Sequence, residues 1–170
     1  MNNDINMVLA VVGAEVDCLR RVYMVGGAVR DLAYGKSPKD FDIVLLAREY
    51  DSPEVVFGEM SDFCACMARR GYPTAIHQAY EGASSDFDSR IQGLVKVTIG
   101  GREVDVMWHH ERNIIDLMST FDFNFNQFFI SETDPAIVHG SKPSSLIQLK
   151  DDVPAERVAY IKQKWAAYHE

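Results

Sequence analysis

The chain has 170 residues, 47% of them hydrophobic and 25% charged, which is the composition of an ordinary globular protein, and we expect a single domain over 1–170. Its formal net charge of −8 excludes an extended basic surface that binds nucleic acid nonspecifically, so any contact with nucleic acid must be local. No segment resembles a membrane span or a signal peptide, and three cysteines form no disulfide pattern; a cytoplasmic protein without a membrane partner is expected.

The N-terminal part of the chain alternates helical and strand patterns. Apolar residues spaced by three and four predict an amphipathic helix over about 4–20, which packs and carries no chemistry. The elements expected next are a buried strand over 22–25, a sharp turn at Gly26-Gly27, a helix over 28–34 ended by Gly35, a second buried strand over 41–47, and a helix over about 53–70 capped by Ser52.

The C-terminal part is dominated by strand patterns. Residues 94–99 and 102–107 flank two glycines and predict a β-hairpin, in which Glu103, Asp105 and Met107 point away from the valines between them. Alternating Phe and polar residues predict a half-buried strand over 121–130, and apolar spacing predicts a helix over about 155–168. Together these patterns indicate an α+β fold, a mixed β-sheet flanked by helices. The segment 73–92 gives only a weak signal, and within it EGASSDFDSR, residues 81–90, is typical of an exposed loop.

Asp40 and Asp42 are spaced i, i+2 at the start of the second buried strand, so their carboxylates project to the same face. Two carboxylates this close repel each other unless a cation lies between them, and the adjacent Lys39 neutralises only one charge. A divalent ion neutralises both, and Mg²⁺ prefers carboxylates together with substrate phosphates. The alternative is a solvated strand end. The similar pair Asp86 and Asp88 lies in no apolar strand, and we expect no metal there.

Gly26-Gly27 lies between a strand and a helix, where the missing side chains allow a phosphate to approach the backbone. A simple tight turn is the alternative reading. Arg30, Lys36 and Lys39 form a local positive group near this turn, although Arg30 has two possible partners, a phosphate or the neighbouring Asp31. A glycine turn, cations and paired carboxylates within about 20 residues favour a site for a triphosphate and a metal.

The stretch VGGAVRDLAYGKSPKDFDIVL resembles the head domain of the tRNA nucleotidyltransferase (CCA-adding) and bacterial poly(A) polymerase family, within the polymerase-β nucleotidyltransferase superfamily. The resemblance implies a polymerase-β-like nucleotidyltransferase fold. It also implies that Gly26 and Gly27 bind the phosphates of an NTP and that Asp40 and Asp42 bind two Mg²⁺ ions. Arg30 and Lys39 are expected to assist in binding the nucleotide.

The same resemblance implies a third carboxylate on a neighbouring strand, and Asp105 stands in the matching place. Glu103 competes for this role, but Asp105 lies deeper in its strand. The family's Arg-Arg-Asp-Phe-Thr-Ile-Asn motif, which contacts ribose and base, resembles residues 120–126, so Asp122 and Asn126 are expected to bind nucleotide. Thr120 and Phe121 replace its two arginines, and the family's Glu-Asp-x-x-Arg selector element has no counterpart. CCA addition to tRNA is therefore not expected.

The expected function is Mg²⁺-dependent transfer of an NMP from an NTP to an acceptor hydroxyl, with release of pyrophosphate and with Asp40, Asp42 and Asp105 as catalytic metal ligands. The acceptor remains open: RNA, a protein or a small molecule. The alternative is a noncatalytic nucleotide-binding or regulatory module derived from such a head domain. A partner chain or a second copy of the chain is a further possible partner.

Overall fold

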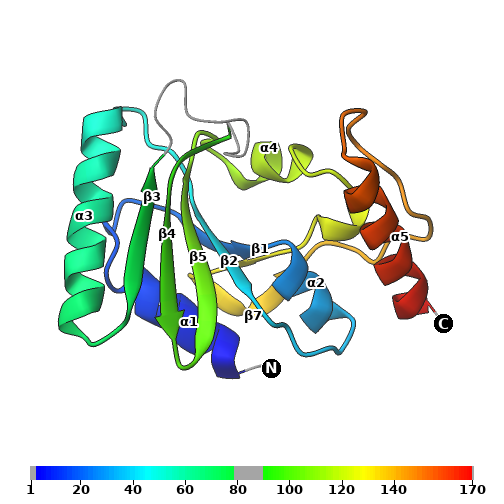
Figure 1. Ribbon diagram of the computed structural model, residues 1–170, viewed down its shortest axis with the longest axis horizontal. Coiled ribbons are helices and arrows are strands. Elements are labelled where there is room, and N and C mark those ends of the chain that lie inside the picture. The colour runs from blue at the N-terminus through cyan, green and yellow to red at the C-terminus, as the bar shows by residue number, and fades with distance from the viewer. Residues whose placement is uncertain (1–2, 79–89, 170) are drawn as a thin grey trace.

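The computed structural model describes residues 3–78 and 90–169, in which a mixed sheet is flanked by helices (Figure 1). Its seven strands follow the order β3-β4-β5-β2-β1-β6-β7; β2 and β5 run parallel, and the other neighbours run antiparallel. This architecture confirms the predicted α+β class.

The strands are β1 (Val22–Val25), β2 (Phe41–Leu45), β3 (Thr74–Gln78), β4 (Ile91–Ile99), β5 (Arg102–His109), β6 (Phe129–Ser131) and β7 (Asp134–His139). The helices are α1 (Asn3–Gly13), α2 (Gly27–Ala33), α3 (Pro53–Arg69), α4 (Ile114–Ser119) and α5 (Ala155–His169), with a 3-10 turn η1 (Asn124–Asn126). None of these helices is both long and apolar enough to cross a membrane.

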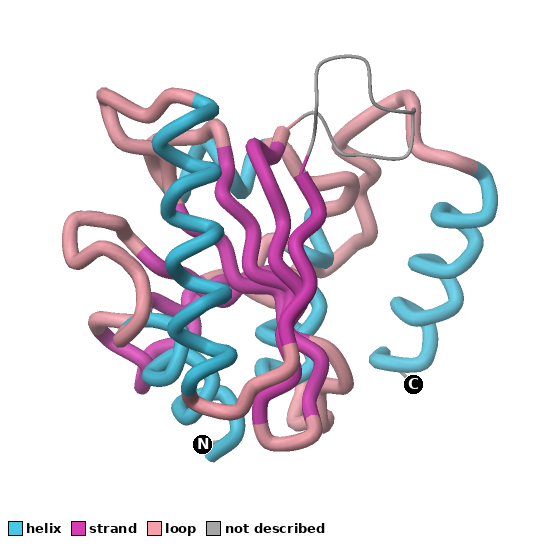
Figure 2. The backbone as a smooth tube through the Cα atoms, turned by 60° about the vertical axis from the view of Figure 1, so that its left-hand side comes forward, coloured by secondary structure: helices cyan, strands magenta, loops and turns pink. Residues whose placement is uncertain are grey.

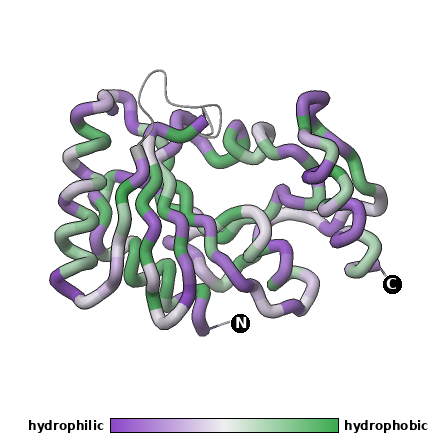
Figure 3. The backbone as a smooth tube through the Cα atoms, viewed as in Figure 1, coloured by the Kyte–Doolittle hydropathy of each residue, from purple (hydrophilic) through white to green (hydrophobic). Residues whose placement is uncertain are grey.

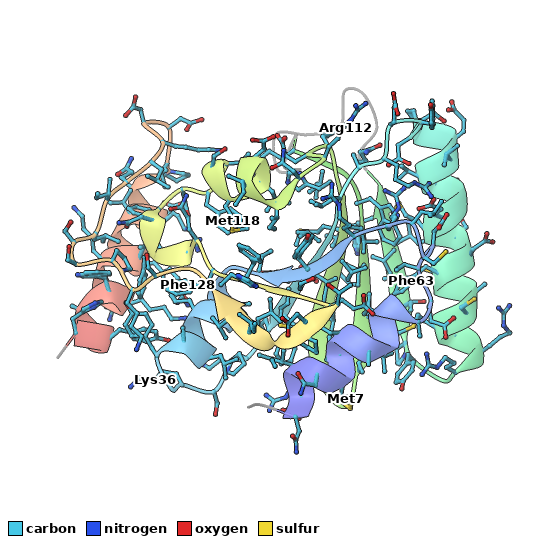
Figure 4. All side chains as sticks on the ribbon, turned by 180° about the vertical axis from the view of Figure 1, so that it is seen from behind. Met7, Lys36, Phe63, Arg112, Met118 and Phe128 are labelled. Carbon is cyan, nitrogen blue, oxygen red and sulfur yellow. The ribbon has the colours of Figure 1, made fainter. Side chains whose placement is uncertain are left out.

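One face of the sheet is buried under α1 and α3. Alternate residues of β2, namely Phe41, Ile43 and Leu45, point into this core and are almost fully buried. Helix α3 lies along β3 and β4 (Figure 2), and Phe63 is directed from α3 into the same core (Figure 4). Hydrophobic and hydrophilic residues alternate along α3 (Figure 3), as expected for a helix with one buried face.

The opposite face carries the other residues of β2, among them Asp42 and Val44. Helix α4 covers part of it, where Leu117 and Met118 pack on Val25 and Val44. Helix α5 lies farther out, beyond α2 (Figure 1), and its Ile161 packs on the aromatic residues that follow α4. Between these helices lies the part of the sheet face that carries Asp42 of β2 and Asp105 of β5, both of which are half-buried.

Most of the predicted elements are confirmed with boundaries shifted by a few residues. The turn at Gly26, the helix that ends before Gly35, the capped helix α3 and the hairpin of β4 and β5 all form as expected. Helix α5 packs through its predicted apolar stripe. All three cysteines are free, which agrees with the absence of a disulfide pattern.

Two elements differ from the prediction. The first helix ends at Gly13 rather than near residue 20, and Leu19 is 75% exposed. The strand predicted over 121–130 is wrong: this segment leaves α4, turns through η1 and enters β6 only at Phe129. Phe123 and Phe125 are nevertheless buried as the alternation required, but they pack against α5 instead of forming a sheet face.

The strands β3 and β7 lie at the two edges of the sheet and were not predicted, nor was α4. Edge strands have one bonded neighbour and less regular burial, so their sequences show little periodicity. Most of the loop expected within 73–92, with Asp86 and Asp88, lies outside the described residues.

Candidate active site

Asp42 and Asp105 face each other across neighbouring strands. The parallel pairing of β2 with β5 places Asp42 in register with Asp105, and both carboxylates project from the open face of the sheet. Glu103, the competing acid, lies before the first residue of β5 that pairs with β2, and it faces Thr98 of β4 instead. The geometry therefore brings Asp105, rather than Glu103, next to Asp42.

The electrostatics of Asp42 reflect this crowding. Burial is the main cause that raises the pKa of Asp42, and the negative charges of Asp105 and Asp40 raise it further, to about 6. Lys96 and Arg157 oppose the shift more weakly. A cation bound close to Asp40, Asp42 and Asp105 would therefore stabilise the ionised form of Asp42.

The glycine turn lies directly against this acidic group. Gly26 has a φ of 68°, which only glycine adopts readily, and a Cβ atom at this position would lie 3.8 Å from Asp42 Oδ2. A Cβ atom at Gly27 would lie 3.5 Å from Arg30 Nη2. The turn thus leaves room for a ligand that contacts the backbone, a carboxylate and a guanidinium group together.

A cleft of about 1150 Å³ opens over the sheet face between the glycine turn, α4 and α5. It is lined by eight of the nine predicted site residues: Gly26, Gly27, Arg30, Lys39, Asp40, Asp42, Asp122 and Asn126. Asp105 instead lines a neighbouring depression of about 240 Å³ between β3, β4 and β5. A volume above 1000 Å³ is large enough for a nucleotide.

Lys96 of β4 binds the carboxylate of Asp105 from the other side. Its Nζ atom lies 3.2 Å from both Asp105 Oδ1 and Oδ2, and the two side chains are 54% and 32% exposed. Across residues 3–78 and 90–169, no three His, Cys, Asp or Glu side chains are grouped closely enough to hold a metal ion in this arrangement. Asp105 must therefore turn from Lys96 before it can share a cation with Asp42.

Arg30, Asn126 and Asp122 form one hydrogen-bonded chain. The buried Arg30 guanidinium donates to Asp31 Oδ1 at 2.6 and 2.8 Å and to Asn126 Oδ1 at 2.6 Å. Asn126 Nδ2 donates to Asp122 Oδ1 at 3.1 Å, and Arg157 Nε donates to Asp122 Oδ2 at 2.7 Å. The sequence left two possible partners for Arg30, a phosphate or Asp31, and in the structure Arg30 binds Asp31.

Burial opposes the ionisation of Asp122, but the hydrogen bond and the charge of Arg157 outweigh it, so the pKa of Asp122 lies below its ordinary value. On the same wall, burial and the bonded carboxylate of Asp31 raise the pKa of Tyr168 to about 12. Helix α5 is thus tied by charge and by hydrogen bonds to the segments that carry Asp31 and Asp122.

Sequence reasoning missed the contribution of α5 and of His109 to the cleft. Arg157, Tyr160 and Lys164 line it from α5. They are spaced i, i+3 and i+7, and each directly precedes a residue of the apolar stripe, so they form the side of the helix next to that stripe. This spacing was a readable signal of a second functional face. His109 is buried at the end of β5 and lines the cleft, whereas the adjacent His110 is exposed.

Comparison with known proteins places these features in a family. The model of the poly A polymerase head domain matches residues 22–142, which contain the glycine turn and all nine predicted site residues. No curated protein matches the chain in sequence.

Solved structures share the fold at low sequence identity. The CCA-adding enzyme of Thermotoga maritima complexed with tRNA is 20% identical with a TM-score of 0.55, over 88% of this chain and 34% of that enzyme. The Bacillus stearothermophilus CCA-adding enzyme in complex with CTP is 21% identical with a TM-score of 0.53, over 84% and 31%. A tRNA-processing enzyme in an apo form is 18% identical with a TM-score of 0.54, over 87% of this chain and 33% of that enzyme. This chain therefore spans about a third of the length of these enzymes.

Proposed function

This chain belongs to the poly A polymerase head domain family, and we propose that it transfers an NMP from an NTP to an acceptor hydroxyl and releases pyrophosphate. The observation that carries the proposal is the pairing of Asp42 with Asp105 on parallel strands, beside a glycine turn in a nucleotide-sized cleft. Structural relatives with these folds were solved with CTP and with tRNA, which supports an NTP as the substrate class.

The acidic group fits Mg²⁺. Asp40, Asp42 and Asp105 supply hard oxygen donors, and burial together with the charges of Asp105 and Asp40 raises the pKa of Asp42 despite the weaker opposing effect of Lys96 and Arg157. Lys96 is exposed and bound only to Asp105 among the described residues, so a divalent ion can displace it. When bound, a pair of Mg²⁺ ions lowers the pKa of the attacking hydroxyl and neutralises the leaving pyrophosphate.

The residues of the chain position the reactants. Gly26 and Gly27 allow the phosphates to reach the backbone beside Asp42, and Lys39 adds a positive charge at the same end of the cleft. In the reaction the acceptor oxygen forms a bond to the α-phosphorus, the bond between this phosphorus and the bridging oxygen breaks, and the hydroxyl proton is lost to solvent. Holding the two reactants in line is the main task of such a site.

Arg30, Asn126 and Asp122 act together in this proposal. Arg30 is buried and bonded to Asp31 and Asn126. It therefore holds the side-chain amide of Asn126 in place and does not extend freely into the cleft. Asn126 and Asp122 then present fixed polar groups to the sugar or base of the nucleotide.

A noncatalytic nucleotide-binding module is the second candidate. It is favoured by the ion pair of Asp105 with Lys96, and by Thr120 and Phe121 in place of two arginines. Such a module would bind an NTP in the cleft without turnover. RNA, a protein and a small hydroxyl compound all remain candidate acceptors, and a partner chain or a second copy is a possible source of further acceptor contacts. Free cysteines and the use of an NTP agree with a cytoplasmic site of action.

The test is incubation of the protein with each α-³²P-labelled NTP, Mg²⁺ and a total cell extract, followed by identification of the labelled molecule. We expect one acceptor class to become labelled, and Asp42→Asn and Asp105→Asn each to abolish labelling while circular dichroism stays unchanged. Binding of NTP by calorimetry with no labelled product and no pyrophosphate would favour the noncatalytic module. Full activity of either variant would refute the assignment of the acids.

A further inference from the structure

Helix α5 presents two different faces. Its Ile161, Trp165 and Tyr168 pack on Phe125 and neighbouring aromatic rings, which anchors the helix. Arg157, Tyr160 and Lys164 line the cleft, and Tyr168 reaches it from the edge of the packing face. The first face explains why the helix is held in place, but it gives no reason for a large aromatic ring on the second face.

Tyr160 is 49% exposed and does not belong to the apolar cluster that anchors α5. Among the described residues that line the cleft, it is the one large apolar side chain with this degree of exposure. A single exposed ring on the surface needs no explanation, but inside a polar cleft lined by five aspartates the Tyr160 ring offers a flat apolar surface to a bound ligand.

The ring is flanked by two cations that are themselves held in place. The Arg157 guanidinium carbon and Lys164 Nζ each lie 5.8 Å from the centre of the Tyr160 ring. Arg157 is fixed by Asp122 at 2.7 Å, and Lys164 reaches Asp31 Oδ2 at 3.5 Å. Tyr160 is therefore already positioned before a ligand arrives, which lowers the entropic cost of stacking.

We propose that Tyr160 is the stacking surface for the base of the bound NTP. This inference rests on the proposed function, since it takes a nucleotide as the ligand of the cleft. The triphosphate is drawn to the glycine turn and Lys39 at one end, and the base of the same molecule then extends toward α5 at the other. Stacking accepts every base because each base has a π face, so Tyr160 contributes affinity with little discrimination among the four NTPs.

The experiment is calorimetric titration with Mg²⁺ and α,β-methylene analogues of ATP, CTP, GTP and UTP, which cannot react. Tyr160→Ala is expected to weaken all four by about 5- to 150-fold, the loss that corresponds to one stacked base. Tyr160→Phe keeps the ring and is expected to bind like the wild type. Inorganic tripolyphosphate carries no base, and its affinity is expected to be the same for all three proteins.

Tyr50→Ala is the matched control, because Tyr50 is 85% exposed and does not line the cleft. Wild-type affinity of Tyr160→Ala for the analogues would overturn the stacking role and leave the proposed function intact. An equal loss for tripolyphosphate would also overturn it, since the ring would then act on the phosphate end or on the fold. A wild-type protein that binds none of the analogues would overturn both proposals.

Discussion

Replacing Asp42 by Asn should stabilise the metal-free protein at neutral pH. Asp42 is held mostly out of water beside Asp40 and Asp105, which raises its pKa from 3.8 to about 6. Because the folded pKa lies above the unfolded one, stability is highest below about pH 4 and is lost as the pH rises through 6. Asparagine has a similar shape and carries no charge, so it avoids this loss.

The magnitude follows from the size of the shift. A pKa of about 6 in the folded protein against 3.8 in the unfolded chain corresponds to about 3 kcal/mol above pH 7, and partial contact with solvent makes this an upper limit. For a protein of this size about 3 kcal/mol raises the melting temperature by roughly 6–12 °C. Mg²⁺ offsets the repulsion among the three carboxylates in the wild type, so it should reduce the difference in melting temperature between the wild type and Asp42→Asn.

The assay is thermal unfolding followed by circular dichroism at pH 4 and pH 7.5, with and without Mg²⁺. We expect wild type and Asp42→Asn to melt within a few degrees of each other at pH 4 and to separate at pH 7.5. Mg²⁺ should then raise the wild-type melting temperature more than that of the variant. The view that Asp42 is a destabilising carboxylate that binds a cation would be refuted if the wild type and Asp42→Asn melted at the same temperature at each pH, or if Mg²⁺ raised both melting temperatures equally.

Three further predictions follow from particular contacts. Arg20 is buried and bonded to Asp51 and Glu59 at 2.8 and 2.5 Å, so Arg20→Ala should lower the free energy of unfolding in urea by about 3–5 kcal/mol; a loss below 1 kcal/mol would show that the ion pairs contribute little. Gly26→Ala should cost about 1–3 kcal/mol, because φ 68° with ψ −132° is a backbone conformation that side chains other than glycine rarely adopt. It should also weaken NTP binding measured by calorimetry, and unchanged binding would remove the turn from the site. Mn²⁺ affinity should fall as the pH drops below about 6, since protons compete for Asp42; a flat profile between pH 5 and 7.5 would contradict this.

The core of the site was predictable from local sequence. Gly26, Asp40 and Asp42 lie within 17 residues of one another, and the strand–turn–helix–strand order around them has clear apolar and glycine signals. The role of Asp105 was expected only from the family resemblance, because the hairpin pattern places Glu103 and Asp105 on the same face of β5. Its register with Asp42, by contrast, depends on the parallel pairing of two strands far apart in the chain, which no local pattern encodes.

The remaining features depend on tertiary packing. Phe123 and Phe125 alternate with polar residues as in a strand. In the structure both rings pack against α5, and the chain between them follows a 3-10 turn instead of a strand. The ion pair of Lys96 with Asp105 depends on the β4–β5 register, which places these two residues opposite each other on neighbouring strands. The cleft wall formed by α5 depends on where the helix docks, because its apolar stripe fixes the packed side but not which neighbouring surface the adjacent polar side will meet.

The most direct test of the central claim is a crystal structure of the protein with Mn²⁺ and an α,β-methylene NTP analogue, with the ions located by anomalous scattering. The account predicts Mn²⁺ bound by Asp40, Asp42 and Asp105, with Lys96 released from Asp105 and the triphosphate at Gly26-Gly27. Ions bound elsewhere, or a triphosphate away from the glycine turn while Lys96 stays on Asp105, would contradict it.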